Sequence, residues 1–206
     1  NGLFVVLVFN RAHVVGSRDQ AGLADVRIES ALSAIIDLED SVACVDGEDK
    51  VNAYSTWLGL MKGDLTSEFE KNGKKVVRRL NSDLSFISPS GDDFSIRARA
   101  LLWIRNVGHL MTTPAVLDSN GDEIFEGLLD AMVTTMLGMH DLKKADGNSR
   151  HGSIYIVKPK MHGPAEVDFA DKIFSKVESF LGIEKYSVKL GIMDEERRTS
   201  VNLKEC

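Results

Sequence analysis

The chain has 206 residues, enough for one large domain or two small ones. A hydrophobic share of 43% is ordinary for a globular protein, and a net charge of −6 disfavours a nucleic-acid-binding surface, which normally carries a basic patch. No apolar run of about 18 residues predicts a membrane span, and no signal-peptide pattern is present. The two cysteines, Cys44 and Cys206, form neither a disulfide framework nor a zinc pattern, which is typical of a cytoplasmic protein.

The first half of the chain mixes two kinds of pattern. Residues 1–28, with the apolar run "LFVVLVF", do not fit a strand–helix alternation. Residues 33–40, "SAIIDLED", predict a buried strand that ends in carboxylates, and residues 46–63 predict a helix. The expected apolar face of that helix comprises Val51, Tyr54, Trp57, Leu58 and Met61.

Residues 63–100 interrupt the alternation. "KGDLTSEFEKNGKK" and "VVRRLN" suggest a helix and then a strand, followed by the turn-rich "SDLSFISPSGDDFS". We expect this segment and residues 1–28 to form a second, smaller α/β region threaded through the main one.

The second half alternates regularly. Strands are predicted over 100–108, 153–160 and 186–193, and a hairpin around Asn120-Gly121 over 115–125. Helices are predicted over 126–143 and 165–182, the latter ending at Gly182 and burying Phe169, Ile173, Val177 and Phe180. Alternating strands and helices indicate βαβ units, a parallel sheet and an α/β fold.

Charged and polar residues gather where four predicted strands end. In parallel α/β folds the site lies at the carboxyl ends of the strands, so these side chains should meet at one edge. Taken singly, each is more simply a solvated loop residue; the repetition on four strands favours a site. The residues are Asp37 and Glu39, then Arg105 and Asn106, then Lys158 and Lys160, and finally Asp194, Glu195 and Glu196.

Carboxylates without a His/Cys cluster suit Mg²⁺ or Mn²⁺, and a nearby arginine offers a planar fork for a substrate carboxylate. The pattern therefore suggests a small 2-oxo acid bound to Mg²⁺. His109 and His162 could also face this edge, although a structural role is the simpler expectation. No phosphate-binding glycine loop and no GxSxG motif occurs.

Five segments in order are specific enough to indicate a family. "IIDLEDSVACVDGEDKV", "WLGLMKGDL", "IRNVGHLMT", "SIYIVKPKMHGPAEV" and "GIMDEERRTSVNL" resemble malate synthases of the G type, with the resemblance running from about residue 17 to 206. It implies a partial TIM (β/α)8 barrel carrying an inserted smaller α/β domain. Residues 30–62 and 101–206 would then be barrel segments, and residues 1–29 and 63–100 would belong to the inserted domain.

The resemblance also implies a chemistry. Members of this family condense acetyl-CoA with glyoxylate and hydrolyse the malyl thioester to malate and CoA in the glyoxylate cycle, using Mg²⁺. By similarity, Arg105 would bind glyoxylate and stabilise the enolate of acetyl-CoA, and Glu195 would ligate Mg²⁺ and contact glyoxylate. Asp37 and Glu39 would hold the metal's waters, and Ser41 and Arg78 are weaker candidates for contact with CoA.

The second metal carboxylate and the catalytic base of the family would lie outside this chain. We therefore expect an acyltransferase fragment of a cytoplasmic, monomeric parent, with the 206-residue chain inactive by itself. Two alternatives remain open. One is an Mg²⁺-dependent lyase of the citrate-lyase β or 2-oxo-acid aldolase type, suggested by "LEDSVA"; the other is a non-catalytic truncated binding module.

Overall fold

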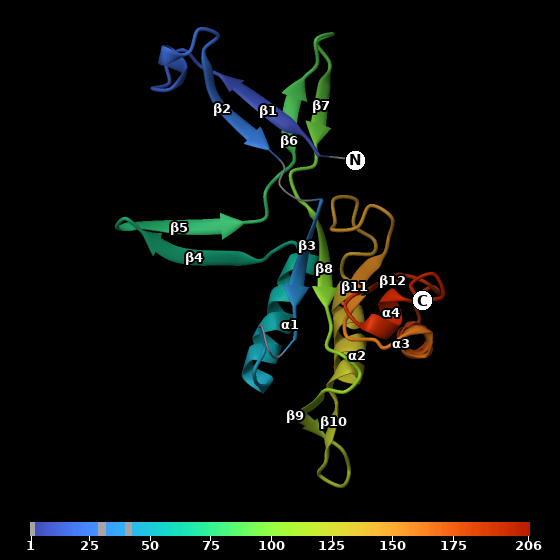
Figure 1. The fold of residues 1–206 in the computed structure, drawn as a ribbon. Coiled ribbons are helices and arrows are strands. Elements are labelled where there is room, and N and C mark those ends of the chain that lie inside the picture. The colour runs from blue at the N-terminus through green and yellow to red at the C-terminus, as the bar shows by residue number, and fades with distance from the viewer. Residues whose placement is uncertain (1–2, 29–31, 40–42) are drawn as a thin grey trace. The chain divides into compact units, whose positions relative to one another are not determined.

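The computed structural model describes residues 3–28, 32–39 and 43–206 (Figure 1). The chain divides into two compact units, Asn1–Ala34 and Ile35–Cys206. Each unit is considered by itself below.

The first unit is built on an antiparallel hairpin. Strand β1 (Val5–Phe9) pairs with β2 (Leu23–Ile28), with Val5 opposite Ile28 and Leu7 opposite Val26, and a short 3-10 turn, η1 (Gly16–Arg18), lies in the connection. The apolar run that did not fit the alternation is therefore β1. Among its described residues, this unit contains strands and a 3-10 turn but no α-helix.

The second unit contains a four-stranded sheet. Its order is β12 (Val188–Ile192), β11 (Ile154–Lys158), β8 (Leu101–Arg105) and β3 (Ser33–Asp37). Strand β11 runs parallel to both of its neighbours, and the arrows of β3 and β8 point the same way in Figure 1. Because neighbouring strands follow one another in the chain with helices between them, the sheet consists of βαβ units. The predicted parallel α/β architecture is confirmed.

Three helices lie next to one another and pack against this sheet. They are α1 (Gly47–Lys62), α2 (Glu126–Gly138) and α3 (Pro164–Leu181), with α2 in contact with both others (Figure 1). Asp46 caps the start of helix α1, because its carboxylate accepts a hydrogen bond from the Asp49 N–H at 2.9 Å. Buried side chains from the helices and strands form one core, including Trp57, Ile104, Ile156, Phe174 and Val188. Because this core includes side chains of β8, β11 and β12, it holds these strands, and therefore their ends, in place.

Two of the predicted helix faces are partly wrong. Val51 is 63% exposed on α1, and Phe169 and Phe180 are 52% and 80% exposed on α3. At 3.6 residues per turn, α3 offers two neighbouring apolar stripes, and the sheet buries only one of them. The buried stripe contains Val167, Ala170, Phe174 and Val177.

The helix expected after residue 63 is also wrong. Strand β4 (Thr66–Lys71) pairs antiparallel with β5 (Lys74–Arg79), and β6 (Leu84–Ile87) pairs with β7 (Asp93–Ile96). The turn between β4 and β5 is Asn72-Gly73, with φ of 53° and 71°. Two successive residues with positive φ match the tight turn that Asn-Gly favours between strands, and this turn signal outweighs the helix-forming lysines and glutamates nearby.

The later elements follow the prediction more closely. The Asn120-Gly121 hairpin is confirmed as β9 (Thr112–Leu117) and β10 (Glu123–Phe125), and α3 ends before Gly182 as expected. Helix α2 ends at Gly138, earlier than the predicted residue 143. A short helix, α4 (Arg197–Ser200), follows β12. None of the helices in the described segments has both the length and the apolar character needed to cross a membrane.

Candidate functional site

The alternation of side chains along the strands explains which residues reach the site. Leu102 and Ile104 of β8 join the core shared with the helices, and so do Ile154 and Ile156 of β11. Successive side chains of a strand point to opposite faces. Arg105 therefore lies on the face of the sheet away from the helices, at the carboxyl end of β8.

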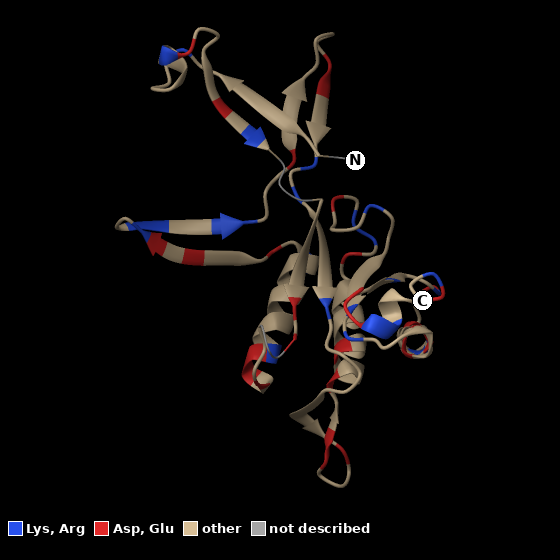
Figure 2. Ribbon diagram, in the orientation of Figure 1, with Lys and Arg blue, Asp and Glu red and all other residues tan. Residues whose placement is uncertain are grey.

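Arg105 joins the ends of two neighbouring strands. Its Nε donates to Asp37 Oδ1 at 2.8 Å, its Nη2 also binds Asp37 Oδ2, and the same Nη2 lies 3.0 Å from Glu39 Oε2. The side chains of Arg105 and Asp37 are 15% and 22% exposed, and that of Glu39 is 6% exposed. Figure 2 shows the acidic end of β3 beside the basic end of β8. The hydrogen bond to Asp37, with the charges of Asp37 and Glu195, raises the pKa of Arg105 above its ordinary value.

Glu195 reaches the same edge from the loop after β12. Its Oε1 accepts a hydrogen bond from the backbone N–H of Lys160 at 2.8 Å, and the Lys160 ammonium contacts Glu39. Lys160 has φ of 54°, an unusual value for a residue with a side chain. Within the "DEER" segment, only Glu195 makes this contact: Asp194 accepts from Ser200 and Glu196 lies 3.7 Å from His162.

The loops after β11 and β12 are tied to each other. The Thr199 hydroxyl accepts a hydrogen bond from the Gly163 N–H at 2.8 Å and donates to the Met161 carbonyl. Gly163 has φ of 89°, and a Cβ at this position would lie 2.9 Å from the Arg198 side chain. The loop that carries Glu195 is therefore anchored to the loop that carries Lys160.

Beneath the edge lies a set of four buried charged residues, which we call the buried quartet: Lys50, Glu126, Asp130 and Lys158. Lys50 Nζ lies 2.6 Å from Glu126 Oε1 and 3.2 Å from Asp130 Oδ1, and Tyr54 donates to Asp130 Oδ1 at 2.6 Å. None of the four is more than 5% exposed. Two cations therefore balance two anions inside the protein.

Lys158 differs from the other cation of the quartet. It ends β11 but belongs to the helix-facing side of the strand, where its Nζ donates to the Val107 carbonyl at 2.6 Å. Burial lowers the pKa of Lys158 to about 8, against a smaller opposing effect of Asp130. The sequence predicted that Lys158 and Lys160 would both face the edge; Lys160 does, whereas Lys158 points into the layer beneath it.

Three members of the quartet were missed by the sequence analysis. Lys50 is four residues before Tyr54 and seven before Trp57, so it lies on the same stripe of α1 as residues predicted to be buried. Asp130 sits within the apolar segment "LLDAM". A charge on a predicted buried stripe is the signal that could have found both, whereas Glu126, at the start of its helix, carried none.

Of the two weaker candidates, only Arg78 lies among the described residues. Ser41 lies outside the described residues. Arg78 lies on β5, where its guanidinium stands 4.9 Å from the centre of the Phe69 ring. Its proposed contact with CoA stays a prediction.

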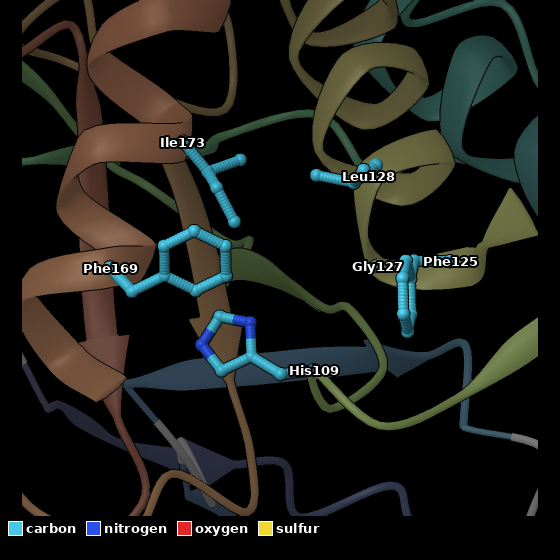
Figure 3. A pocket seen from close by; sticks show the side chains of 6 residues that line it. All are labelled: His109, Phe125, Gly127, Leu128, Phe169 and Ile173. Carbon is cyan, nitrogen blue, oxygen red and sulfur yellow. The ribbon is translucent and has the colours of Figure 1, made fainter. Parts of the chain in front are cut away.

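His109 lies beside the edge in a small apolar pocket. Its Nε2 is 3.1 Å from the Glu166 carbonyl, and its ring centre is 5.0 Å from that of Phe169 (Figure 3). Burial and the nearby Lys158 charge lower the pKa of His109. The pocket, of about 170 Å³, lies between α2 and α3 and is lined by His109, Phe125, Gly127, Leu128, Phe169 and Ile173.

The donor set at the edge suits a hard cation by its chemistry. Asp37, Glu39 and Glu195 supply only carboxylate oxygens, the ligands that Mg²⁺ prefers. These carboxylates are engaged with Arg105 and Lys160, and within the described residues no three His, Cys, Asp or Glu side chains are grouped as a metal cluster.

Comparison with known proteins identifies the family to which this chain belongs. Residues 101–206 match the model of the malate synthase TIM barrel domain. The chain belongs to the malate synthase family. The match covers β8, β11 and β12 and therefore the strand ends that carry Arg105 and Glu195.

Full-length relatives in the malate synthase family extend the similarity to the rest of the chain. A malate synthase G of Halalkalibacterium halodurans is 51% identical over 208 residues, covering 100% of this chain and 29% of that protein. Malate synthase G proteins of Corynebacterium efficiens and Corynebacterium glutamicum are each 48% identical, covering 100% and 98% of this chain. The chain thus spans 28–29% of the length of these relatives.

Proposed function

We propose that the protein carrying this chain is a malate synthase of the G type, an acyltransferase that joins acetyl-CoA to glyoxylate and hydrolyses the product thioester. The observation that carries the proposal is the position of Arg105, which lies between Asp37 and Glu39 at the ends of two parallel strands. The similarity to malate synthase G proteins along the whole chain supports it.

The proposed reaction has two steps. A base removes a proton from the acetyl methyl group, the resulting carbanion carbon bonds to the aldehyde carbon of glyoxylate, and the former aldehyde oxygen takes up a proton, giving malyl-CoA. Water then adds to the thioester carbonyl, and the CoA thiol leaves, giving malate. This chain would supply the groups that bind glyoxylate and stabilise negative oxygen, whereas the base would come from outside it.

Arg105 would carry the largest share of that work. Its Nε and Nη2 bind Asp37, so the Nη1 side of the guanidinium, which lies 3.7 Å from Met193 Sδ, would donate to the glyoxylate carboxylate. Fixed donors aimed at a developing oxyanion stabilise it without reorganisation during the reaction. Asp37 orients the guanidinium through its two contacts.

Mg²⁺ would be held by Glu195, with Asp37 and Glu39 hydrogen-bonded to its waters. When bound, Mg²⁺ supplies Lewis-acid polarisation of the aldehyde. Glu195 is anchored by the Lys160 N–H, so one carboxylate oxygen is fixed in place by the backbone.

The domain boundaries form part of the proposal. Residues 30–62 and 101–206 would build the barrel segments, because all four strands of the parallel sheet come from them. Residues 1–29 and 63–100 would belong to an inserted smaller domain, to which the β1–β2, β4–β5 and β6–β7 hairpins would contribute. We also propose a cytoplasmic, monomeric parent.

The activity test uses the protein that carries this chain, incubated with Mg²⁺, acetyl-CoA and glyoxylate. We expect release of CoA thiol matched by formation of malate. Parallel reactions with pyruvate and with malyl-CoA test the lyase alternative. Cleavage of malyl-CoA to acetyl-CoA and glyoxylate, without hydrolysis of its thioester, would contradict the proposal.

The metal assignment has its own test, which does not depend on turnover. Binding of Mn²⁺ is followed by electron paramagnetic resonance in the wild type, Glu195→Gln and Asp194→Asn. We expect Glu195→Gln to weaken binding at least about tenfold, and Asp194→Asn to leave it within twofold because Asp194 is engaged with Ser200. Equal losses in the two variants would contradict the assignment of Glu195.

A further inference from the structure

The buried quartet holds the backbone at the ends of two neighbouring strands. Lys50 Nζ donates to the Leu38 carbonyl at 3.0 Å, and Leu38 stands between Asp37 and Glu39. Asp130 Oδ2 accepts from the Val107 N–H at 2.9 Å, and Lys158 donates to the Val107 carbonyl. The backbone N–H and the backbone carbonyl of Val107, two residues after Arg105, are therefore both bound by buried charges.

One ion pair connects the hydrogen bond at Leu38 to the hydrogen bonds at Val107. Lys50 Nζ and Asp130 Oδ1 are 3.2 Å apart, although the residues are separated by 80 positions in sequence. Lys50 comes from α1 and Asp130 from α2, so the pair links the helix after β3 to the helix after β8. The pair thus connects the backbone at Leu38 to the backbone at Val107, in addition to the direct hydrogen bond that the Leu38 N–H donates to the Arg105 carbonyl at 3.0 Å.

We propose that Lys50 and Asp130 are positioning residues for the site, which hold Arg105 in register with Asp37 and Glu39. This inference rests on the proposed function. Neither residue reaches the open edge, since Lys50 is 2% and Asp130 is 0% exposed. They act through the backbone of Leu38 and Val107, and the substrate they would affect is the one that Arg105 binds.

The cost of burying charge favours a positioning role over a purely stabilising one. Buried ion pairs are often no more stabilising than well-packed apolar side chains of the same volume. An apolar pair at these positions would leave the Leu38 carbonyl and the Val107 N–H without their buried partners. The charged pair satisfies both groups and adds a second connection to the backbone hydrogen bond between Leu38 and Arg105.

Helix α3 offers a matched control. Glu178 is a buried carboxylate, 2% exposed, which accepts hydrogen bonds from the Tyr186 N–H at 2.9 Å and the Val188 N–H at 2.8 Å. It binds backbone at the beginning of β12, at the opposite end of the sheet. Glu178→Gln therefore removes a buried charge and disturbs backbone hydrogen bonds without touching the site.

The kinetic experiment compares Asp130→Asn with Glu178→Gln in the protein that carries this chain. We expect Asp130→Asn to lower kcat/KM for glyoxylate about 10- to 100-fold and to raise KM for glyoxylate, while KM for acetyl-CoA stays within twofold. Glu178→Gln should leave both constants within twofold, with a similar fall in Tm. Equal kinetic effects of the two variants would overturn the proposal, and so would an unchanged kcat/KM in Asp130→Asn.

A second readout separates this proposal from the proposed function. With ¹⁵N-labelled arginine, the Arg105 Nε–H resonance, assigned by its loss in Arg105→Lys, reports the hydrogen bond to Asp37. We expect it to shift in Asp130→Asn and to stay in place in Glu178→Gln. If the wild type forms no malate, the proposed function fails and the resonance alone decides this inference.

A second variant keeps the test decisive if Asp130→Asn does not fold. Lys50→Gln removes the charge but retains an N–H donor near the Leu38 carbonyl. It should shift the same resonance and raise the same KM. An unmoved Arg105 resonance in a folded Lys50→Gln protein would overturn the proposal.

Discussion

The carboxylates at the two ends of the parallel sheet have different kinds of partner. At the beginning of its strands, Asp141 accepts from the Asn148 and Ser149 N–H groups at 2.6 and 2.7 Å, and Glu178 binds the Tyr186 and Val188 N–H groups. These partners are 7 to 10 residues away in sequence. At the carboxyl ends, Asp37 pairs with Arg105 across 68 residues and Asp130 with Lys50 across 80.

The difference separates local structure from a site. A carboxylate that binds nearby backbone N–H groups closes one loop and can do so in any fold. A carboxylate that binds a cation on another strand or helix fixes two distant segments against each other. The carboxyl ends of the strands are thus held by ion pairs between distant segments as well as by hydrogen bonds to backbone, whereas Asp141 and Glu178 at the opposite end bind nearby backbone N–H groups.

The largest test of this comparison is Arg105→Lys. Lysine keeps the charge but loses the planar fork, so we expect kcat for malate formation to fall about 10²- to 10³-fold. Steady-state kinetics with glyoxylate provides the measurement. A fall of less than threefold would show that charge alone suffices at this end of the sheet.

The next test concerns the pH dependence of stability at Lys158. Its pKa is about 8 in the folded protein and near 10.5 when unfolded, so between these values the unfolded state binds more protons. The free energy of unfolding should therefore carry a penalty of about 3 kcal/mol below pH 8 that disappears as the pH rises toward 10.5. Urea unfolding of the wild type and Lys158→Met at pH 7 and pH 9.5 measures it.

Relative to Lys158→Met, the wild type should be more stable at pH 9.5 than it is at pH 7. If the difference in unfolding free energy between the two proteins is the same at both pH values, burial does not lower the pKa of Lys158. The carboxyl ends would then lack a buried cation of lowered pKa.

A smaller effect is expected at the beginning of the strands. Asp141→Asn keeps one acceptor oxygen but replaces the other with a donor, so one of the two N–H groups loses its partner. We expect a loss of about 1 to 3 kcal/mol in unfolding free energy and kinetic constants within twofold of the wild type. A specific rise in KM for glyoxylate would remove the distinction between the two ends.

The smallest effect belongs to an exposed pair. Lys172 and Asp168 form an i,i+4 ion pair on α3 with side chains 69% and 60% exposed. Lys172→Gln should change the unfolding free energy by less than about 0.5 kcal/mol and leave kinetics unchanged. Lys172→Gln therefore serves as the control in denaturant unfolding, and its change in unfolding free energy is compared with those of the other variants.

The sequence was sufficient for the strands and for the edge where they end. Period-2 and period-3.6 patterns predicted all four strands of the sheet, and the charged residues at the ends of β3 and β8 predicted that Asp37 and Arg105 would meet. These features depend on local patterns and on one rule of parallel sheets.

The sequence was insufficient where two local signals competed or where a contact was distant. The lysines and glutamates around Asn72-Gly73 favoured a helix, but the turn produced a hairpin. Phe169 and Phe180 belong to a stripe that α3 leaves exposed, because the choice between stripes depends on the packing of the whole layer. The Lys50–Asp130 pair spans two helices, and no local pattern contains it.

The tie between Gly163 and Thr199 has a consequence for how these sequences can diverge. A side chain at position 163 would press on Cγ and Cδ of Arg198, which would have to shift, and φ of 89° is strained for any residue with a Cβ. Loss of the Thr199 hydroxyl would leave the Gly163 N–H to find a new acceptor. We expect positions 163, 198 and 199 to change together during evolution, so that the two loops are inherited as a single unit.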